Sequence, residues 1–301
     1  MKILITGGSG LIGRVLTQSL HDLGHDVSIL TRKINPKLDI KQYTWNPERK
    51  EMDADALSNT EIIIHLAGAN IAEKRWTKKR FKELYSSRVD SAHFLYEQVK
   101  ASQILLKSFI SSSAIGWYGT STTEEVFAEE APCAEGPLAF MSEAWESAAD
   151  QFLELGCSVS KVRTGIALST QGGALPKMMM PIALGVGAPI GSGEQYMPWI
   201  HIDDLCAIFV SLVEGKLTPG TYNGVAPEHL KNKDLTKLIA KTIKRPLWLP
   251  NVPSFVLSLI FGKMSVLLLN GSRVSSKKLL KNGFEFRYSH VEPALRQLLE
   301  K

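Results

Sequence analysis

A glycine-rich turn near the start of the chain constrains the fold more than any other feature of the sequence. The segment Thr6-Gly7-Gly8-Ser9-Gly10-Leu11-Ile12-Gly13 follows an apolar run, Lys2–Thr6, and leads into a helical pattern over Leu11–Leu23. A tight strand-to-helix turn needs residues without Cβ, and the free N–H groups at the start of such a helix bind a pyrophosphate. In this strand–turn–helix context the glycine spacing predicts a dinucleotide-binding Rossmann unit, against the alternative of a bare glycine turn.

The composition is typical of a soluble globular protein. The 301 residues are 44% hydrophobic and 22% charged, which excludes a mainly disordered chain. Three scattered cysteines (Cys133, Cys157 and Cys206) exclude a disulfide framework and favour a reducing compartment, so we expect a cytoplasmic protein. The N-terminus turns glycine-rich too soon for a signal peptide, and prolines interrupt the longest apolar stretch, 246–262, so no membrane span is expected. The net charge of +5 says little about partners.

Short apolar runs alternate with helical patterns over the first 165 residues, which predicts an α/β protein with a doubly wound parallel sheet. The expected strands are Lys2–Thr6, Asp26–Thr31, Gln42–Trp45, Glu61–Leu66, Lys107–Ser111 and Ser158–Arg163, and the expected helices are Leu11–Leu23, Thr77–Ala101 and Leu138–Leu155. Beyond about Thr164, glycine, proline and methionine become frequent, and a later helix is expected from Asp203 as its N-cap. We expect a nucleotide-binding domain over residues 1–165, to which later segments can return, and a smaller C-terminal α/β substrate domain over residues 166–301.

The end of the second strand indicates which dinucleotide binds. An NAD site usually carries Asp or Glu about 20 residues after the glycine turn, where it binds the ribose 2′-hydroxyl. Here the strand ends in Thr31, Arg32 and Lys33, and the first acid after it is Asp39. A carboxylate would repel a 2′-phosphate, whereas Arg binds phosphate bidentately. Arg32 therefore predicts NADP(H) as the cofactor, against the alternative of a solvated surface cation.

Further motifs in the chain indicate a protein family. They are His65-Leu66-Ala67-Gly68, Ser111-Ser112-Ser113-Ala114 before Tyr118-Gly119, Arg75-Trp76-Thr77, Ser87-Arg88-Val89, Trp199-Ile200-His201 and Gly283-Phe284-Glu285-Phe286. With the glycine turn, they resemble the extended short-chain dehydrogenase/reductase superfamily, and within it an epimerase-family subgroup of uncertain activity with a C-terminal domain of unknown function. The resemblance covers nearly the whole chain, with that domain starting at about Pro250. The residues that we assign to the cofactor are Thr6, Gly7, Gly10, Leu11, Ile12, Gly13, Thr31, Arg32, Leu66, Ala67, Gly68 and Arg88.

The resemblance also implies a catalytic set. Enzymes of the superfamily use a Ser or Thr that binds the substrate oxygen, a Tyr that exchanges the proton, and a Lys four residues after the Tyr that lowers its pKa. Ser113 fits the first role. The Tyr-x-x-x-Lys pair is absent from the place where the resemblance puts it, since Leu138 or Phe140 stands where the Tyr is expected and Ser142 or Ala144 where the Lys is expected.

Other polar side chains near the expected site have competing interpretations. Tyr118, five residues beyond Ser113, is either a catalytic group or a packed aromatic with a tethered hydroxyl. Arg88 replaces an Asn that related reductases carry near the active site, and it either anchors a substrate anion or the cofactor, or forms a surface salt bridge. Glu143 is more typical of a solvated helix residue than of an acid catalyst. His65 is expected to be a packed or hydrogen-bonded structural residue.

Three later features allow a ligand as well as a structural role. The segment Met178–Trp199 is a candidate substrate wall, with Gln195 and Trp199 as contacts, although core packing explains each residue singly. The run Lys74–Lys82 carries six cations and two aromatics, which suits a polyanion but fits a solvated helix start better. His201 and Asp203 lack further metal ligands, so no metal is expected, and His201 is expected to tie a strand to the following helix.

Together these patterns predict an NADP(H)-binding oxidoreductase or epimerase-like enzyme that acts on a small carbonyl or hydroxyl compound. Substrate is expected in the crevice beyond the carboxyl ends of the strands. The alternative is a catalytically silent NADP(H)-binding sensor or regulatory protein, because the Tyr-x-x-x-Lys pair is absent. A third hypothesis is a protein that binds a polyanion through the basic segment Lys74–Lys82. The expected partner is a small-molecule substrate, with neither nucleic acid nor membrane, and a homo-oligomer is left open.

Overall fold

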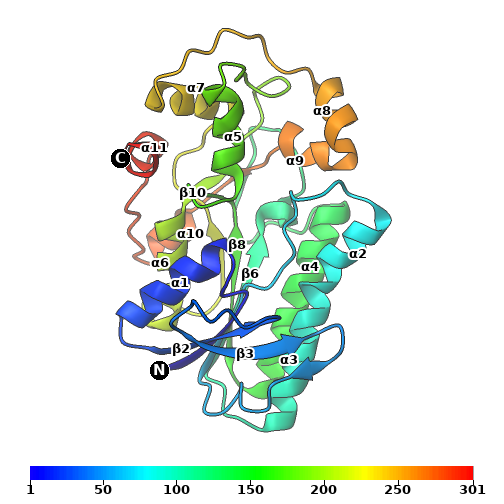
Figure 1. Cartoon of the computed structure of the whole chain (residues 1–301), viewed down its shortest axis with the longest axis vertical. Helices are drawn as coiled ribbons and strands as arrows, with labels where there is room; N and C mark the ends of the chain where they lie inside the picture. Colours follow the sequence, from blue (N-terminus) through cyan, green and yellow to red (C-terminus); the bar gives the residue numbers. More distant parts are fainter. Residues whose placement is uncertain (301) are drawn as a thin grey trace.

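A central parallel sheet organises the lower half of the molecule in the computed structural model, which describes residues 1–300 (Figure 1). Its strands lie in the order β11 (Thr221–Gly224), β8 (Ser158–Thr164), β6 (Ser108–Ala114), β5 (Ile62–His65), β1 (Lys2–Thr6), β2 (Asp26–Thr31), β3 (Lys41–Asn46) and β4 (Glu51–Met52). Every neighbouring pair is parallel except β3 and β4 at the edge. The strand order reverses direction between β1 and β5, which is the doubly wound Rossmann arrangement, so the predicted fold class is confirmed.

Helices cover both faces of this sheet. They are α1 (Leu11–Asp22) and α6 (Ile202–Val213) on one face, and α3 (Val89–Ser102) and α4 (Pro137–Asp150) on the other. The central strand is apolar without alternation, since Ile3, Leu4 and Ile5 are each 0% exposed. Ile3 and Ile5 pack with α1 and α6, whereas Leu4 packs with α3. Burial on both faces is the reason that strands of a parallel sheet read as continuous apolar runs.

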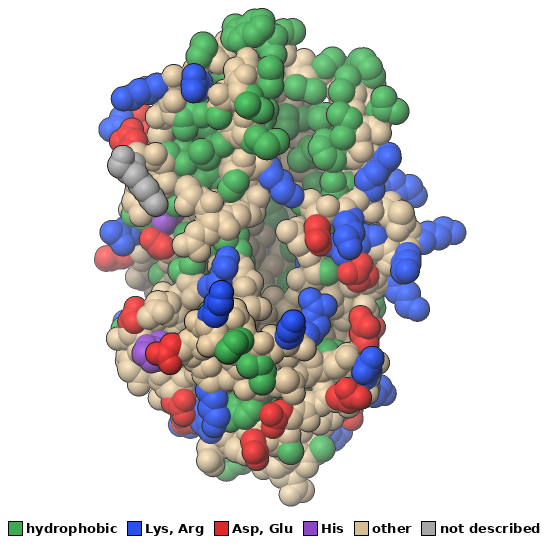
Figure 2. All heavy atoms as spheres, in the orientation of Figure 1, with side chains coloured by type: hydrophobic (Ala, Val, Ile, Leu, Met, Phe, Trp, Pro, Cys, Tyr) green, Lys and Arg blue, Asp and Glu red, His purple; other side chains and the backbone are tan. Residues whose placement is uncertain are grey.

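A second, smaller core builds the upper half of the molecule. Its elements are β9 (Ile166–Leu168), β10 (Trp199–His201), α5 (Ala174–Ala183), α7 (Asn232–Thr242) and α11 (Val291–Leu299). They share one hydrophobic cluster, in which Trp199 is fully buried. This cluster lies above the carboxyl ends of the sheet, so a crevice separates it from the nucleotide-binding half (Figures 1 and 2).

Short elements complete the fold. They are α2 (Lys78–Ser86), β7 (Val126–Phe127), α8 (Ser254–Phe261), α9 (Val266–Leu269), β12 (Arg273–Val274), α10 (Lys277–Lys281) and the 3-10 helices η1 (Ile115–Tyr118), η2 (Gln151–Leu155) and η3 (Gly262–Ser265). The most apolar of them, α8, is only 8 residues long. Over residues 1–300, no helix combines the length and apolar character that crossing a membrane requires.

Three of the places where the chain passes between the two halves are adjacent. β8 continues into β9, β10 leads into α6, and β11 leads back towards α7. Backbone N–H groups join these crossings through three hydrogen bonds: Gly165 to Gly224 O (3.1 Å), Ile166 to Pro198 O (2.8 Å) and Ala226 to Trp199 O (2.7 Å). Thus α6 and β11, from beyond residue 165, belong to the lower half, while the domain boundary near 165 stays a prediction.

The predicted single helix over Thr77–Ala101 is wrong, because it is two helices that meet at Ser87 and Arg88. Both side chains bond back to the last turn of α2. The Ser87 hydroxyl donates to Leu84 O at 3.0 Å, and Arg88 Nη1 donates to the same oxygen at 3.0 Å. Such local bonds compete with the helical ladder and redirect the chain.

The predicted N-cap at Asp203 is also wrong. The cap of α6 is His201, whose ring Nδ1 accepts the Asp203 N–H at 3.1 Å. The opposite ring nitrogen lies 3.0 Å from Gln297 Oε1 on α11. His201 therefore ties β10 to α6 as expected.

Candidate functional site

The glycine turn between β1 and α1 forms a cradle that admits no side chain at two points. Gly7 has φ +72°, and a β-carbon there would lie 2.8 Å from the backbone carbon of Leu66 at the end of β5. A β-carbon on Gly13 would lie 2.2 Å from Gly7 O. These contacts bring the turn, the start of α1 and the end of β5 together, as the predicted pyrophosphate cradle requires.

The start of α1 leaves its first N–H groups without a capping side chain. Gly10 is the N-cap and has no side chain to accept a hydrogen bond, and no acid lies in the first turn. The N–H groups of Leu11, Ile12 and Gly13 therefore lack helical partners, and the helix dipole adds positive potential there. A β-carbon on Gly173, in the upper half, would lie 3.1 Å from Leu11 Cδ2, so the start of α1 lies close to the upper half.

A buried hydrogen-bond chain joins the ends of β1 and β5. Ala67 N–H donates to Thr6 Oγ1 at 3.1 Å, and Thr6 Oγ1 lies 2.9 Å from His65 Nδ1. The opposite nitrogen, His65 Nε2, lies 3.3 Å from Arg88 O. One tautomer satisfies all three contacts, with the Thr6 hydroxyl donating to Nδ1 and Nε2–H donating to the carbonyl.

Burial lowers the pKa of His65 to about 4, so the ring is neutral at physiological pH. Its side chain is 0% exposed, and both ring nitrogens are engaged. The expectation that His65 is structural is confirmed.

Arg88 is a half-buried cation without a counter-ion. Its Nη1 donates to Leu84 O and its Nη2 to Ala69 O, each at 3.0 Å, and the guanidinium lies 5.2 Å from the ring of Trp145. Burial first, and repulsion by Arg80 second, lower the pKa of Arg88 to about 10, and no carboxylate among residues 1–300 offsets this. The salt-bridge alternative therefore does not describe Arg88, which lies beside Gly68.

Arg32 follows β2 directly on the surface. Thr31 Oγ1 accepts Lys33 N–H at 3.3 Å, which turns the chain at the strand end. Over the described range 1–300, no carboxylate forms an ion pair with Arg32. The Arg32 side chain is exposed and free to meet a phosphate.

Ser113 lies at the end of β6 and contacts an ion pair that the sequence patterns did not reveal. Its hydroxyl donates to Glu146 Oε1 on α4 at 2.7 Å. Glu146 in turn accepts from Arg163 Nε at 2.7 Å and from Nη2 at 3.0 Å, a bidentate pair with both side chains 4% exposed. The hydrogen bond and the charge of Glu146 outweigh burial and raise the pKa of Arg163 above its ordinary value.

Tyr118 extends this buried network to β11. Its hydroxyl donates to Asn223 Oδ1 on β11 at 2.7 Å and accepts from Arg163 Nη1 at 2.9 Å. The side chain is 1% exposed, and burial raises the pKa of Tyr118 to about 12. These contacts match the alternative weighed for Tyr118, a packed aromatic with a tethered hydroxyl.

The positions where the resemblance places the Tyr–Lys pair carry no proton-transferring group. Leu138 is buried in an apolar cluster with Leu84 and Met141. The Ser142 hydroxyl donates to Leu138 O at 2.9 Å, a bond within α4. Gln195 and Trp199, the candidate wall contacts, are 1% and 0% exposed, as expected for core packing.

Comparisons with known proteins bear on this site. A model of the NAD dependent epimerase/dehydratase family matches residues 3–223, and a model of a domain of unknown function (DUF1731) matches residues 252–298. Mouse epimerase family protein SDR39U1 is 33% identical over 99% of this chain and 100% of its own, and Bacillus subtilis (strain 168) epimerase family protein YfhF is 34% identical over 99% and 98%. The solved structure of human SDR39U1 (isoform 2) with NADPH is 30% identical over 100% of both chains, with a TM-score of 0.89. The resemblance read from the motifs is confirmed.

The pKa of His65 predicts a pH-dependent stability. A ring with an ordinary pKa of 6.5 when unfolded and about 4 when folded binds fewer protons in the native state between these values. Its contribution is therefore complete above pH 6.5 and is lost as the pH falls to 4, by about 3 kcal/mol at 1.36 kcal/mol per unit. Urea unfolding from pH 7.5 to 4.5 should show this loss in the wild type and not in His65→Gln. His290→Gln, which removes a 72% exposed ring, should keep the wild-type slope, and equal slopes in all three proteins would contradict the assignment.

The ion pair of Glu146 and Arg163 predicts a large stability loss. Glu146→Gln leaves a buried guanidinium without its counter-charge, which costs about 3–5 kcal/mol, whereas Glu146→Met with Arg163→Met recovers most of it. The control is Asp150→Asn, which breaks a pair with a 44% exposed carboxylate and should cost under about 1 kcal/mol. The measurement is the free energy of urea unfolding, and equal costs for the two single variants would disprove the role of burial.

Proposed function

Because the chain belongs to the NAD dependent epimerase/dehydratase family, we propose that it binds NADP(H) in the crevice and acts as an oxidoreductase or epimerase-like enzyme on a small carbonyl or hydroxyl compound. The observation that carries the proposal is the cradle at the end of β1, where two glycines exclude side chains beneath uncapped N–H groups. The human relative solved with NADPH supports the choice of cofactor. A bound nicotinamide would supply the hydride chemistry.

The chain's own residues divide the binding of this cofactor between them. The backbone of Gly7 to Gly13 would take the pyrophosphate, and Arg32 the 2′-phosphate. Leu66, Ala67 and Gly68 present the backbone that the Thr6–His65 bonds hold in place. Arg88, still charged at neutral pH, supplies the remaining positive charge and would pair with an anionic group of cofactor or substrate. Lys and Arg side chains also gather around the hollow in Figure 2, which suits an anionic ligand.

Ser113 is the proposed contact to the reacting oxygen. Its hydroxyl donates to Glu146, so its lone pairs can accept a hydrogen bond from a substrate hydroxyl. The bidentate pair with Arg163 fixes the Glu146 carboxylate, and Glu146 in turn fixes the direction of the Ser113 hydroxyl. This arrangement favours a substrate that enters as an alcohol. For Tyr118, the contacts support a positioning role through Asn223 and Arg163.

A silent NADP(H)-binding sensor is the second candidate. The observation that favours it is the apolar environment of Leu138, where the resemblance places the catalytic Tyr. Under this candidate the cradle binds the cofactor, and Ser113 with Glu146 and Arg163 only stabilises the fold.

The cofactor proposal predicts a specific effect of Arg32→Ala. Loss of charge-assisted bonds to a 2′-phosphate should weaken NADPH binding by about 10- to 100-fold and leave NADH binding unchanged. The dissociation constants of both cofactors can be measured by fluorescence titration. Lys216→Ala removes an exposed cation just after α6, at the opposite edge of the sheet, where Glu214 pairs with His25 before β2, and it should change neither constant. Equal affinity of the wild type for NADH and NADPH would defeat the assignment.

The catalytic proposal predicts turnover that depends on Ser113. A screen of small alcohols with NADP⁺ and of small carbonyl compounds with NADPH should reveal activity that Ser113→Ala lowers by about 100-fold or more, with NADPH affinity unchanged. Ser112→Ala, which removes the neighbouring buried hydroxyl from the same strand, should keep the activity. NADPH binding without Ser113-dependent turnover favours the sensor, and absence of NADPH binding rejects both candidates.

A further inference from the structure

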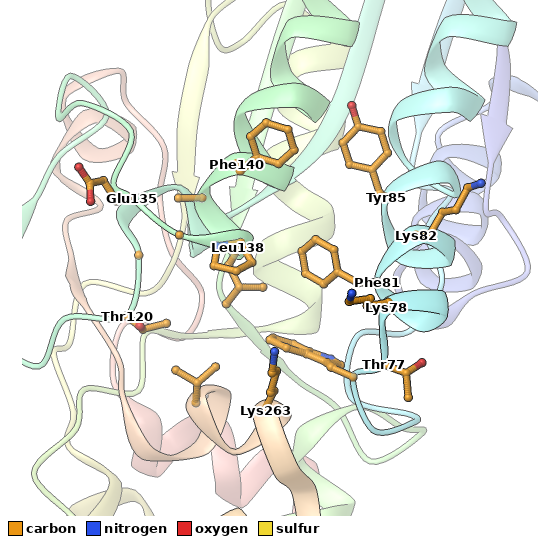
Figure 3. A pocket seen from close by; sticks show the side chains of 16 residues that line it. Thr77, Lys78, Phe81, Lys82, Tyr85, Thr120, Glu135, Leu138, Phe140 and Lys263 are labelled. Atoms are coloured by element: carbon orange, nitrogen blue, oxygen red, sulfur yellow. The ribbon is translucent and has the colours of Figure 1, made fainter.

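A separate cavity lies between α2, the start of α4, and the η3–α9 segment, and it shares none of the residues assigned to the cofactor (Figure 3). Its volume is about 690 Å³, within the range of about 300–1,000 Å³ typical of small-molecule sites. Aromatic and aliphatic side chains form most of its wall: Trp76, Phe81, Tyr85, Leu138, Phe140 and Val266.

Two contacts orient the aromatic side chains of the wall. The Trp76 indole N–H donates to Ile71 O at 2.9 Å, so the polar edge of that ring is already satisfied. Tyr85 and Phe140 stack with ring centroids 6.1 Å apart, and Phe140 is 59% exposed. A pre-formed apolar wall of this kind favours a ligand with an aromatic or aliphatic body.

Positive charge lies at the mouth of the same cavity. In Figure 3 the ammonium groups of Lys263 and Lys78 point into the space, while Lys82 points outward and the one lining acid, Glu135, points away. Within residues 1–300, no carboxylate oxygen lies within 4.0 Å of the Lys263 or Lys78 ammonium nitrogen. The cavity therefore combines an apolar interior with two cations that the protein leaves unpaired.

We propose that this cavity binds an organic monoanion with an aromatic or aliphatic body, its carboxylate or equivalent group meeting Lys263 and Lys78. The wall comes from three separate parts of the chain, residues 76–85, 119–140 and 263–266, which surround a compact molecule better than they accommodate an extended chain. The site contains none of the cofactor residues, but Leu138, where the resemblance places the catalytic Tyr, lines it, so the test uses binding without cofactor, which does not depend on the proposed turnover.

The test uses a matched pair of probes, 2-naphthoate and the neutral 2-naphthamide, titrated calorimetrically into the full chain. Binding of the carboxylate should be about tenfold tighter than that of the amide and should weaken with added salt. Lys263→Met should weaken naphthoate binding at least fivefold and leave amide binding unchanged. Lys281→Met, which removes a lysine from α10 outside the cavity, should leave both unchanged.

Variants that fill the cavity distinguish probe binding in this cavity from binding to other apolar surfaces. Val266→Trp should abolish binding of both probes, and Thr120→Trp, on the segment after η1, serves the same purpose if the first variant does not fold. Undiminished naphthoate binding in a folded, blocked variant would overturn the proposal. A second result would also overturn the proposal. If the protein binds no naphthoate and sediments as a dimer that Phe140→Lys dissociates, a second copy of the chain covers the cavity. Duplex DNA binding that needs Lys263, again without naphthoate binding, would likewise overturn it.

Discussion

The hydrogen-bonded link between the ends of β1 and β5 is the constraint on which the rest of the site depends. Thr6, a neutral His65 and the carbonyl of Arg88 form one buried chain, and Ala67 N–H closes it onto the strand end. This chain sets the path of the backbone that Gly7 approaches so closely that no β-carbon fits. It also anchors the point where α2 ends and α3 begins, so the same bonds position the nucleotide cradle and the unpaired guanidinium beside it.

The middle of the parallel sheet could be predicted from local patterns because β1, β2 and β5 are buried on both faces, whereas the short strands β4 and β11 carry no such pattern. The cradle residues follow from the same logic, since the glycine spacing and the strand–turn–helix context are contiguous in sequence. The break at Arg88 could not be predicted this way, because helical periodicity continues through it and only two side-chain bonds to Leu84 O interrupt the helix. The capping of α6 by His201 was missed for a similar reason, since imidazole is an uncommon cap and Asp203 is a common one.

The partners of Ser113 lay beyond sequence reasoning for another reason. Glu146, Arg163 and Asn223 come from α4, β8 and β11, and no spacing between them signals that their side chains meet. One weak signal exists, since charged residues on an otherwise buried strand and helix face need partners. Where the superfamily resemblance places a proton-transferring pair, this chain has an apolar cluster, and its ionic network lies deeper, between α4 and the sheet. The cation without a counter-ion is therefore Arg88, and the hydroxyl that contacts the buried ion pair is that of Ser113.

The three adjacent chain crossings restrict how the two halves can move relative to each other. Backbone hydrogen bonds at Gly165, Trp199 and Ala226 join the crossings to one another. The crossings are also close-packed, since a β-carbon on Gly165 would lie 2.3 Å from Pro198 O. Sliding one half across the other would break these bonds together, whereas a small rotation about the line of crossings preserves them. Of the two motions, rotation is the one that these three hydrogen bonds permit, and it changes the width of the crevice.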